Sequence, residues 1–211
     1  MSRDERALLP GIAEALRNGE VVALPTDTVY GVGVLAADAD AAVRIFALKG
    51  RPEAVALPVL VADLDAALRL APPGLTSLQH LGERLWPGAL TIVVPRREGL
   101  DWRLGGNGRT IGVRCPDHDL LRELLSITGP LAVSSANRHG LAPATTRDEV
   151  RRQLGTELRC LDGGRCARPP STVVELADGT VRRIRAGAIS FETVEAAFGG
   201  KSGSTCSVGL V

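Results

Sequence analysis

Residues 25–33 read PTDTVYGVG and directly follow the apolar run VVAL at residues 21–24. The apolar run predicts a short buried strand, so the polar segment is expected to leave the strand end as a loop. The loop carries two threonine hydroxyls, a carboxylate, a phenol and two glycines. Ligands of open α/β sheets bind where strands end. We therefore expect this loop to belong to a binding site.

Helical and strand patterns alternate along the rest of the chain. Helices are expected over residues 10–18, from Asp38 or Asp40 to 49, after Asp63, and from Thr146 to about 154. Strands are expected over residues 57–61, 89–94, 110–114, 131–133, 172–176 and 180–184, with Asp178-Gly179 as the turn of a hairpin between the last two. This alternation favours an α/β fold, a mixed sheet with helices on its faces.

The composition fits one globular domain. The chain has 211 residues, of which 45% are apolar, so it is long enough to bury a core. We expect a domain over residues 1–198 and a flexible tail over residues 199–211, where Gly and Ser are frequent. The net charge of +1 excludes attraction of nucleic acid or an anionic membrane by global charge, although a local basic patch stays open.

The cysteines and the N-terminus indicate a cytoplasmic protein. The four cysteines show neither C-x-x-C spacing nor a histidine pair at metal-ligand spacing, so we expect reduced thiols and no protein-built metal site. There is no apolar stretch near 20 residues and no secretory pattern at the N-terminus. We expect no membrane partner.

Lys49 and Arg51 form a candidate anion site. Of the 25 basic residues only Lys49 and Lys201 are lysines, and Lys49 alone lies in the body of the expected fold. Both cations stand where a helix ends and can turn toward one polyanion such as a triphosphate. The alternative is that a helix C-terminus favours basic residues because of its dipole.

Three further segments carry candidate binding groups. Ser134-Ser135-Ala136-Asn137 leaves a strand and can hold phosphate or ribose, or it can be an ordinary Ser/Asn turn. The alternation of strand 110–114 places Arg114 at a strand end, where it can clamp a small carboxylate or form a surface ion pair. Ser171 and Arg185 bracket the late hairpin and can reach one cleft.

In this order, the segments resemble the YrdC-type threonylcarbamoyl-AMP synthase family, from about Val21 to Gly187. The resemblance rests on residues 25–33, Lys49-x-Arg51, Trp86-Pro87-Gly88-Ala89-Leu90-Thr91, 110–114, Ser135-Ala136-Asn137, 171–174 and Arg185-x-Gly187. It implies a twisted open sheet with a large, concave, positively charged cavity. At this length the chain corresponds to the short form, without the additional C-terminal domain of longer members.

The resemblance also implies an activity. L-threonine, bicarbonate or CO2, and ATP give threonylcarbamoyl-adenylate and pyrophosphate, and the product serves threonylcarbamoyl-adenosine formation in tRNA. Such a protein is a nucleotidyltransferase with ATP as a substrate, and Mg²⁺ is expected on the phosphates. The further partners that the resemblance implies are tRNA and downstream threonylcarbamoyl-transferase proteins.

Residue roles follow from the resemblance by position. The implied catalytic residues are Lys49, Arg51, Ser135 and Asn137. The implied ATP-binding residues are Lys49, Arg51, Thr110, Ser135, Asn137 and Arg185. The implied threonine-binding residues are Thr26, Thr28, Tyr30, Arg114 and Ser171.

The chain departs from the family pattern after Pro52. Family members usually have Asn-Pro-Leu followed by a His, whereas residues 53–62 read EAVALPVLVA. Pro143 stands where a serine is common, and Glu175 stands where an aspartate is usual.

Two other functions remain open from the sequence. One is a tRNA- or double-stranded-RNA-binding module that uses the arginines of segments 147–152 and 182–185, which salt-dependent RNA binding without ATP turnover would indicate. The other is a carbamoyl-adenylate-forming enzyme of the same fold with a different acceptor.

Overall fold

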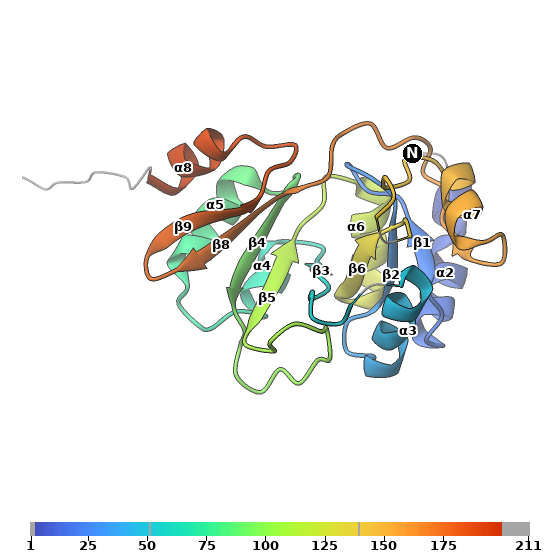
Figure 1. The fold of residues 1–211 in the computed structure, drawn as a ribbon, viewed down its shortest axis with the longest axis horizontal. Helices are drawn as coiled ribbons and strands as arrows, with labels where there is room; N and C mark the ends of the chain where they lie inside the picture. The colour runs from blue at the N-terminus through green and yellow to red at the C-terminus, as the bar shows by residue number, and fades with distance from the viewer. Residues whose placement is uncertain (1–2, 51, 139, 200–211) are drawn as a thin grey trace, which may run out of the picture.

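The computed structural model describes residues 3–50, 52–138 and 140–199 (Figure 1). Within these residues, one sheet contains the strands β1 (Val22–Leu24), β2 (Gly31–Leu35), β3 (Val59–Leu60), β4 (Leu90–Pro95), β5 (Thr110–Arg114), β6 (Leu131–Ser135), β7 (Arg159–Cys160), β8 (Thr172–Ala177) and β9 (Thr180–Arg185). Their order is β7-β1-β2-β6-β3-β5-β4-β8-β9. Parallel and antiparallel pairs both occur, which confirms the predicted mixed sheet.

The helices are α1 (Arg3–Ala7), α2 (Leu9–Arg17), α3 (Ala39–Lys49), α4 (Leu64–Leu68), α5 (Thr76–Leu85), α6 (Asp119–Thr128), α7 (Arg147–Leu154) and α8 (Phe191–Gly199). Three predicted N-caps are confirmed, because the side chains of Asp38, Asp63 and Thr146 each accept a hydrogen bond from a backbone N–H of the first turn. α1, α5 and α8 were not predicted.

The prediction of a loop through Gly33 was wrong. Gly31 and Gly33 belong to β2, which pairs antiparallel with β1 and with β6. A Cβ on Gly31 would lie 2.5 Å from a methyl group of Val133, and one on Gly33 would lie 3.0 Å from Leu24. Glycine usually weakens a strand, but it also marks a close approach of neighbouring chains. The binding loop therefore ends at Tyr30.

The helices cover different parts of the sheet. α2 and α6 pack together on β1, β6 and β3 through a leucine-rich cluster. α3 packs against β2 with residues such as Ile45, and belongs to a second cluster that also contains α5. α5 and α8 lie beside the β4–β8–β9 end of the sheet (Figure 1).

The strands β4, β5 and β8 direct alternate residues to opposite faces, as the two-residue period of a strand requires. Ile92, Val113 and Val174 are fully buried in the hydrophobic core. The intervening residues line two pockets on the other face, and they are Thr91, Val93, Thr110, Gly112, Arg114 and Val173. The binding groups are thus supplied by the same strands that build the core.

Some predictions fall outside the described residues. Arg51 is one of them, and so is the expected tail except for Gly199, which is the last residue of α8. The single domain over residues 1–198 stays a prediction. None of the helices in the described part of the chain combines the length and the apolar character that crossing a bilayer requires.

Candidate active site

Two adjoining pockets lie on the face of the sheet opposite to Ile92, Val113 and Val174. The smaller, of about 150 Å³, is lined by the loop before β2, by the end of β6 and by Arg114. The larger, of about 600 Å³, is lined by residues 54–58 and by β4, β5 and β9. Both pockets share Pro58, Thr91, Ser171 and Arg185 as a common wall. The pockets therefore form one continuous site with two compartments.

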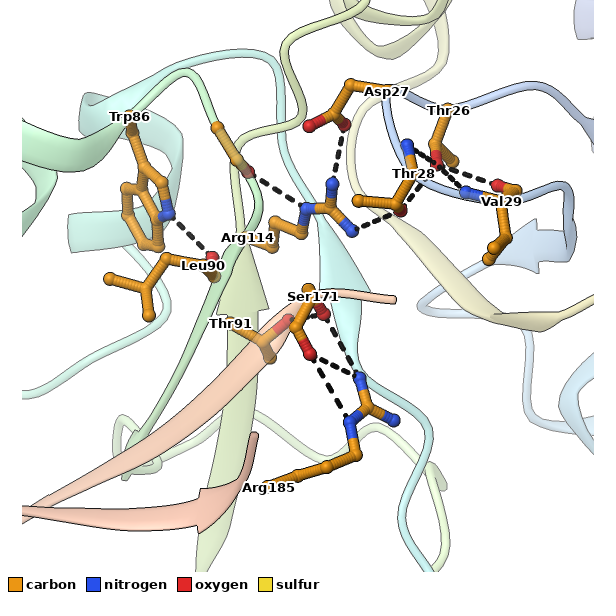
Figure 2. A network of polar contacts seen from close by, with 11 residues as sticks. Thr26, Asp27, Thr28, Val29, Trp86, Leu90, Thr91, Arg114, Ser171 and Arg185 are labelled. Carbon is orange, nitrogen blue, oxygen red and sulfur yellow. Dashed lines mark hydrogen bonds and ion pairs between the residues drawn. The ribbon is translucent and has the colours of Figure 1, made fainter. Parts of the chain in front are cut away.

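Arg114 is fixed from three sides, as Figure 2 shows. Its Nε donates to the carbonyl of Gly88 at 3.0 Å, Nη1 donates to Thr28 Oγ1 at 3.1 Å, and Nη2 forms an ion pair with Asp27 Oδ1 at 2.5 Å. A guanidinium has five N–H groups. Two of them have no partner among residues that the structure describes, and two is the number that a carboxylate can take in a bidentate pair.

The ion pair of Arg114 and Asp27 is buried, with 6% and 4% of the two side chains exposed. Burial lowers the pKa of the Arg114 guanidinium, and the charge of Asp27 partly offsets this effect. Asp27 Oδ2 is buried without a hydrogen-bond partner in the described parts of the chain. Because each charge offsets the desolvation of the other, the loss of either one would leave an uncompensated buried charge.

The loop of residues 26–29 is held by the hydroxyl of Thr26. This oxygen accepts from the backbone N–H groups of Thr28 and Val29 and donates to Val29 O at 2.7 Å, an arrangement typical of a threonine turn. The 2.9 Å contact between the two threonine hydroxyls is then donated by Thr28. Thr28 Oγ1 consequently has only acceptor capacity left to offer to the smaller pocket.

Tyr30 lines the smaller pocket, but its hydroxyl is engaged elsewhere. It donates to Gly164 O at 2.8 Å and accepts from Gly163 N at 3.2 Å. Burial is the main cause that raises the pKa of this phenol far above its usual range. The ring therefore faces the pocket while the hydroxyl ties the loop to residues 162–164.

We expect Tyr30→Phe to lower the free energy of unfolding by about 0.5–1.5 kcal/mol, because the hydrogen bonds of the hydroxyl with Gly164 O and Gly163 N are lost. Urea denaturation of the variant and the unsubstituted protein measures this difference. Equal midpoints and equal slopes would show that the hydroxyl contributes nothing to the fold.

Lys49, Ser135 and Asn137 come together at the end of β6. The side chain of Lys49 is 4% exposed, and its Nζ donates to Ser135 O, to Asn137 O at 2.6 Å and to Asn137 Oδ1 at 3.4 Å. The amide of Asn137 donates to Arg138 O and Leu141 O, both at 2.9 Å. Of these three residues, Ser135 lines the smaller pocket, whereas Lys49 and Asn137 line neither of the two pockets. The ammonium group of Lys49 thus contacts the backbone of the turn that follows β6.

The remaining predicted residues divide between the compartments. Thr110 lines only the larger pocket, whereas Ser171 and Arg185 line both. Burial lowers the pKa of the Arg185 guanidinium. The smaller pocket is lined by all five residues that were expected to bind threonine, which are Thr26, Thr28, Tyr30, Arg114 and Ser171. Arg51 lies outside the described residues.

Two residues of the site were missed by the sequence reasoning. Asp27 was part of the quoted loop, and Thr91 was part of a quoted motif, but neither received a role. The alternation of β4 was the available signal for Thr91, since it places this residue opposite the core residues Leu90 and Ile92. The role of Asp27 was harder to predict, because the sequence does not show which basic residue forms an ion pair with a carboxylate in a loop.

The departures from the family pattern lie at the site. Residues 54–58 line the larger pocket, and Leu60 and Pro143 line the smaller one. Glu175 instead pairs with Arg182 on the neighbouring strand β9. The apolar segment after Pro52 therefore contributes surface to both compartments.

The mixed sheet and the two adjoining pockets lined by Arg114 and Arg185 define an α/β protein with a binding site for anionic ligands. A protein-family model described as "Telomere recombination", for Sua5, YciO and YrdC, matches residues 14–187. The chain belongs to this Sua5/YciO/YrdC family.

Several proteins of similar sequence are named threonylcarbamoyl-AMP synthase. The threonylcarbamoyl-AMP synthase of Chromohalobacter salexigens is 41% identical over 177 residues, which are 80% of this chain and 93% of that protein. The threonylcarbamoyl-AMP synthase of Bacillus subtilis is 38% identical over 197 residues, 90% of this chain and 57% of the relative. The structure of P. abyssi Sua5 complexed with L-threonine superposes with a TM-score of 0.86 at 32% identity, over 92% of this chain and 58% of that one.

Proposed function

We propose that the chain is an L-threonylcarbamoyladenylate synthase, an enzyme that makes threonylcarbamoyl-AMP and pyrophosphate from L-threonine, CO2 or bicarbonate, and ATP. The observation that carries this proposal is the small pocket with Arg114 at its wall, which opens into a larger pocket through four shared residues. The names of the relatives and the L-threonine in the Sua5 structure support it.

Threonine is assigned to the smaller pocket. The two remaining N–H groups of Arg114 can take its carboxylate in a bidentate pair. Thr28 Oγ1 can accept a hydrogen bond from the amine or the hydroxyl of the substrate. Leu60 and Val133 offer apolar surface for the methyl group. One methyl group changes specificity by about tenfold or more, so we expect serine to be a clearly poorer substrate.

The reaction needs two bond-forming steps. The neutral amine of threonine forms a bond to the carbon of CO2, and a proton passes from nitrogen to water, which leaves a carbamate. A carbamate oxygen then attacks the α-phosphorus of ATP, and the bond to the bridging oxygen of the β-phosphate breaks to release pyrophosphate. Catalysis of such a step comes mainly from positioning and from neutralisation of charge.

The nucleotide is assigned to the larger pocket, beside Thr110 and Arg185. Lys49, Ser135 and Asn137, together with Arg51 from the resemblance, are assigned to the leaving pyrophosphate. In the described part of the chain, no group of three or more His, Cys, Asp or Glu side chains is placed to hold a metal ion. Mg²⁺, which usually binds through substrate phosphates and a few protein ligands, would enter with ATP and neutralise the phosphate oxygens.

The product is a mixed anhydride of a carbamate and AMP, so another protein must transfer its threonylcarbamoyl group. We propose tRNA as the final acceptor, with a downstream threonylcarbamoyl-transferase as a partner. We therefore propose that the activity is cytoplasmic, because ATP and tRNA occur together in the cytoplasm.

Pyrophosphate release from ATP and bicarbonate tests the proposal when threonine, serine and no amino acid are compared. We expect release that depends on L-threonine and is about tenfold weaker with serine. Release without any amino acid would favour a carbamoyl-adenylate-forming enzyme. No release, together with salt-dependent RNA binding, would instead favour the RNA-binding module.

A further inference from the structure

The common wall of the two pockets contains a connected polar network. Thr91 Oγ1 and Ser171 Oγ lie 2.9 Å apart, and either atom can be the donor. Arg185 Nη2 donates to Ser171 O at 2.8 Å and to Ser171 Oγ at 3.2 Å, as Figure 2 shows. Thr91 and Ser171 are only 4% and 6% exposed. Two hydroxyls and a cation thus meet where the compartments join.

The order of the groups in the proposed product, threonine then carbamoyl then AMP, determines which of them lies at the common wall. Its carbamoyl group is bonded to the threonine nitrogen on one side and, through oxygen, to the α-phosphorus on the other. If threonine occupies the smaller pocket and the nucleotide the larger one, the carbamoyl group lies at the residues that both pockets share. We propose that Thr91, Ser171 and Arg185 form the subsite that binds CO2 as the carbamate carboxylate. This inference rests on the proposed function.

The chemistry of the three groups suits a carboxylate. A carbamate is an anion with two acceptor oxygens, and the guanidinium of Arg185 supplies charge and N–H donors. Because Arg185 already donates to Ser171 Oγ, the Ser171 proton is available either to Thr91 or to a ligand. When a carboxylate is bound, Ser171 can donate to Thr91, and the Thr91 hydroxyl can then donate a hydrogen bond to the carboxylate. The hydroxyl pair can therefore adapt from the empty to the occupied site without breaking a buried hydrogen bond.

The backbone around the network is closely packed. The strand of Thr91 pairs with β8 directly after Ser171, and Thr172 N donates to Ala89 O at 3.0 Å. A Cβ on Gly187 would lie 2.4 Å from Pro170 O, so the chain that follows Arg185 is in direct contact with the chain that precedes β8. The three side chains are therefore held by the sheet and not by a free loop, as a precise subsite requires.

Thr91→Val tests the subsite, because valine keeps the shape of threonine and removes only the hydroxyl. With ATP and threonine saturating, we expect the bicarbonate concentration for half-maximal pyrophosphate release to rise about tenfold or more, because one hydrogen bond to a charged group contributes at least that factor. Carbonic anhydrase in the assay keeps CO2 and bicarbonate at equilibrium. The KM for ATP and the Kd for threonine, measured by calorimetry in bicarbonate-free buffer, are expected to change less than twofold. Thr91→Ser is expected to restore the bicarbonate dependence.

Thr172→Val is the matched control. Thr172 lies beside Ser171 but is fully buried, lines neither pocket, and bonds through its hydroxyl to the backbone of Ile189. We expect this variant to be less stable and to keep the bicarbonate dependence of the unsubstituted protein.

Three results would overturn the inference. One is a bicarbonate dependence of Thr91→Val within twofold of the unsubstituted protein. Another is an equal rise in the Kd for threonine, which would show a general loss of the pocket. The third is a failure of Thr91→Ser to restore the dependence. If the unsubstituted protein itself releases no pyrophosphate in response to threonine and bicarbonate, the proposed function falls as well, so the two failures are distinguishable.

Discussion

Arg114→Ala is expected to lower kcat/KM for threonine by about 10³, with little change in the KM for ATP. Two charge-assisted hydrogen bonds to the carboxylate are lost, and each contributes about 1.5–3 kcal/mol. Pyrophosphate release at varied threonine concentrations measures the effect. A KM for threonine within threefold of the unsubstituted value would contradict the assignment of Arg114 to the carboxylate.

The same substitution leaves Asp27 buried without its counterion, which typically costs about 3–5 kcal/mol of stability. A second change separates this structural effect from the loss of binding. In the double variant Arg114→Ala, Asp27→Asn, the buried charge is removed, so we expect much of the stability to return. Activity is expected to stay low, because the second substitution does not restore the guanidinium that takes the carboxylate. Recovery of both properties would mean that Arg114 acts only through the fold.

Lys49→Met is expected to lower kcat by about 10²–10³, the usual effect of removing a group that stabilises charge in the transition state. Methionine has a similar length and is apolar, so it can occupy the buried position, but it removes the charge together with the hydrogen bonds to Ser135 O and Asn137 O. Single-turnover pyrophosphate release at saturating ATP and threonine measures the chemical step.

Arg44→Met provides the control for Lys49→Met. Arg44 lies on the same helix α3, but it is exposed and donates to Gly19 O at 2.9 Å, whereas Lys49 is buried and donates to the turn that follows β6. We expect turnover of this variant within twofold of the unsubstituted protein. If both variants reduce turnover equally, the effect belongs to the helix and not to a cation at the pyrophosphate.

The fold class and most elements were predictable because they depend on local patterns. The caps at Asp38, Asp63 and Thr146 depend on a side chain and a backbone N–H a few residues away, so sequence alone identifies them. The Asp178-Gly179 turn is confirmed for the same reason, since both residues adopt the positive φ that this hairpin turn needs. The β2 strand was missed because Gly31 and Gly33 read as loop residues. They lie in a strand because the neighbouring strands approach so closely that a larger side chain would not fit, and the sequence does not show which strands are neighbours.

The site was predictable as a set of residues but not as a set of contacts. The smaller pocket collects all five residues expected to bind threonine. Sequence did not show that Tyr30 uses its hydroxyl to hold residues 163–164, or that Asp27 pairs with Arg114. Such contacts join residues far apart in the chain, and a single sequence contains no record of those distances.

The connections within the site also bear on how the protein folds. Arg114 contacts Asp27 and Thr28, which lie 87 and 86 positions away in the chain, and Thr91 contacts Ser171 across 80 positions. Contacts between distant segments form slowly, because the entropy of loop closure must be overcome first. Helices such as α3 can form from local signals, whereas the binding groups meet only when β4, β5 and β8 have paired. During refolding, recovery of turnover is therefore a late event, and helical circular dichroism should return before it.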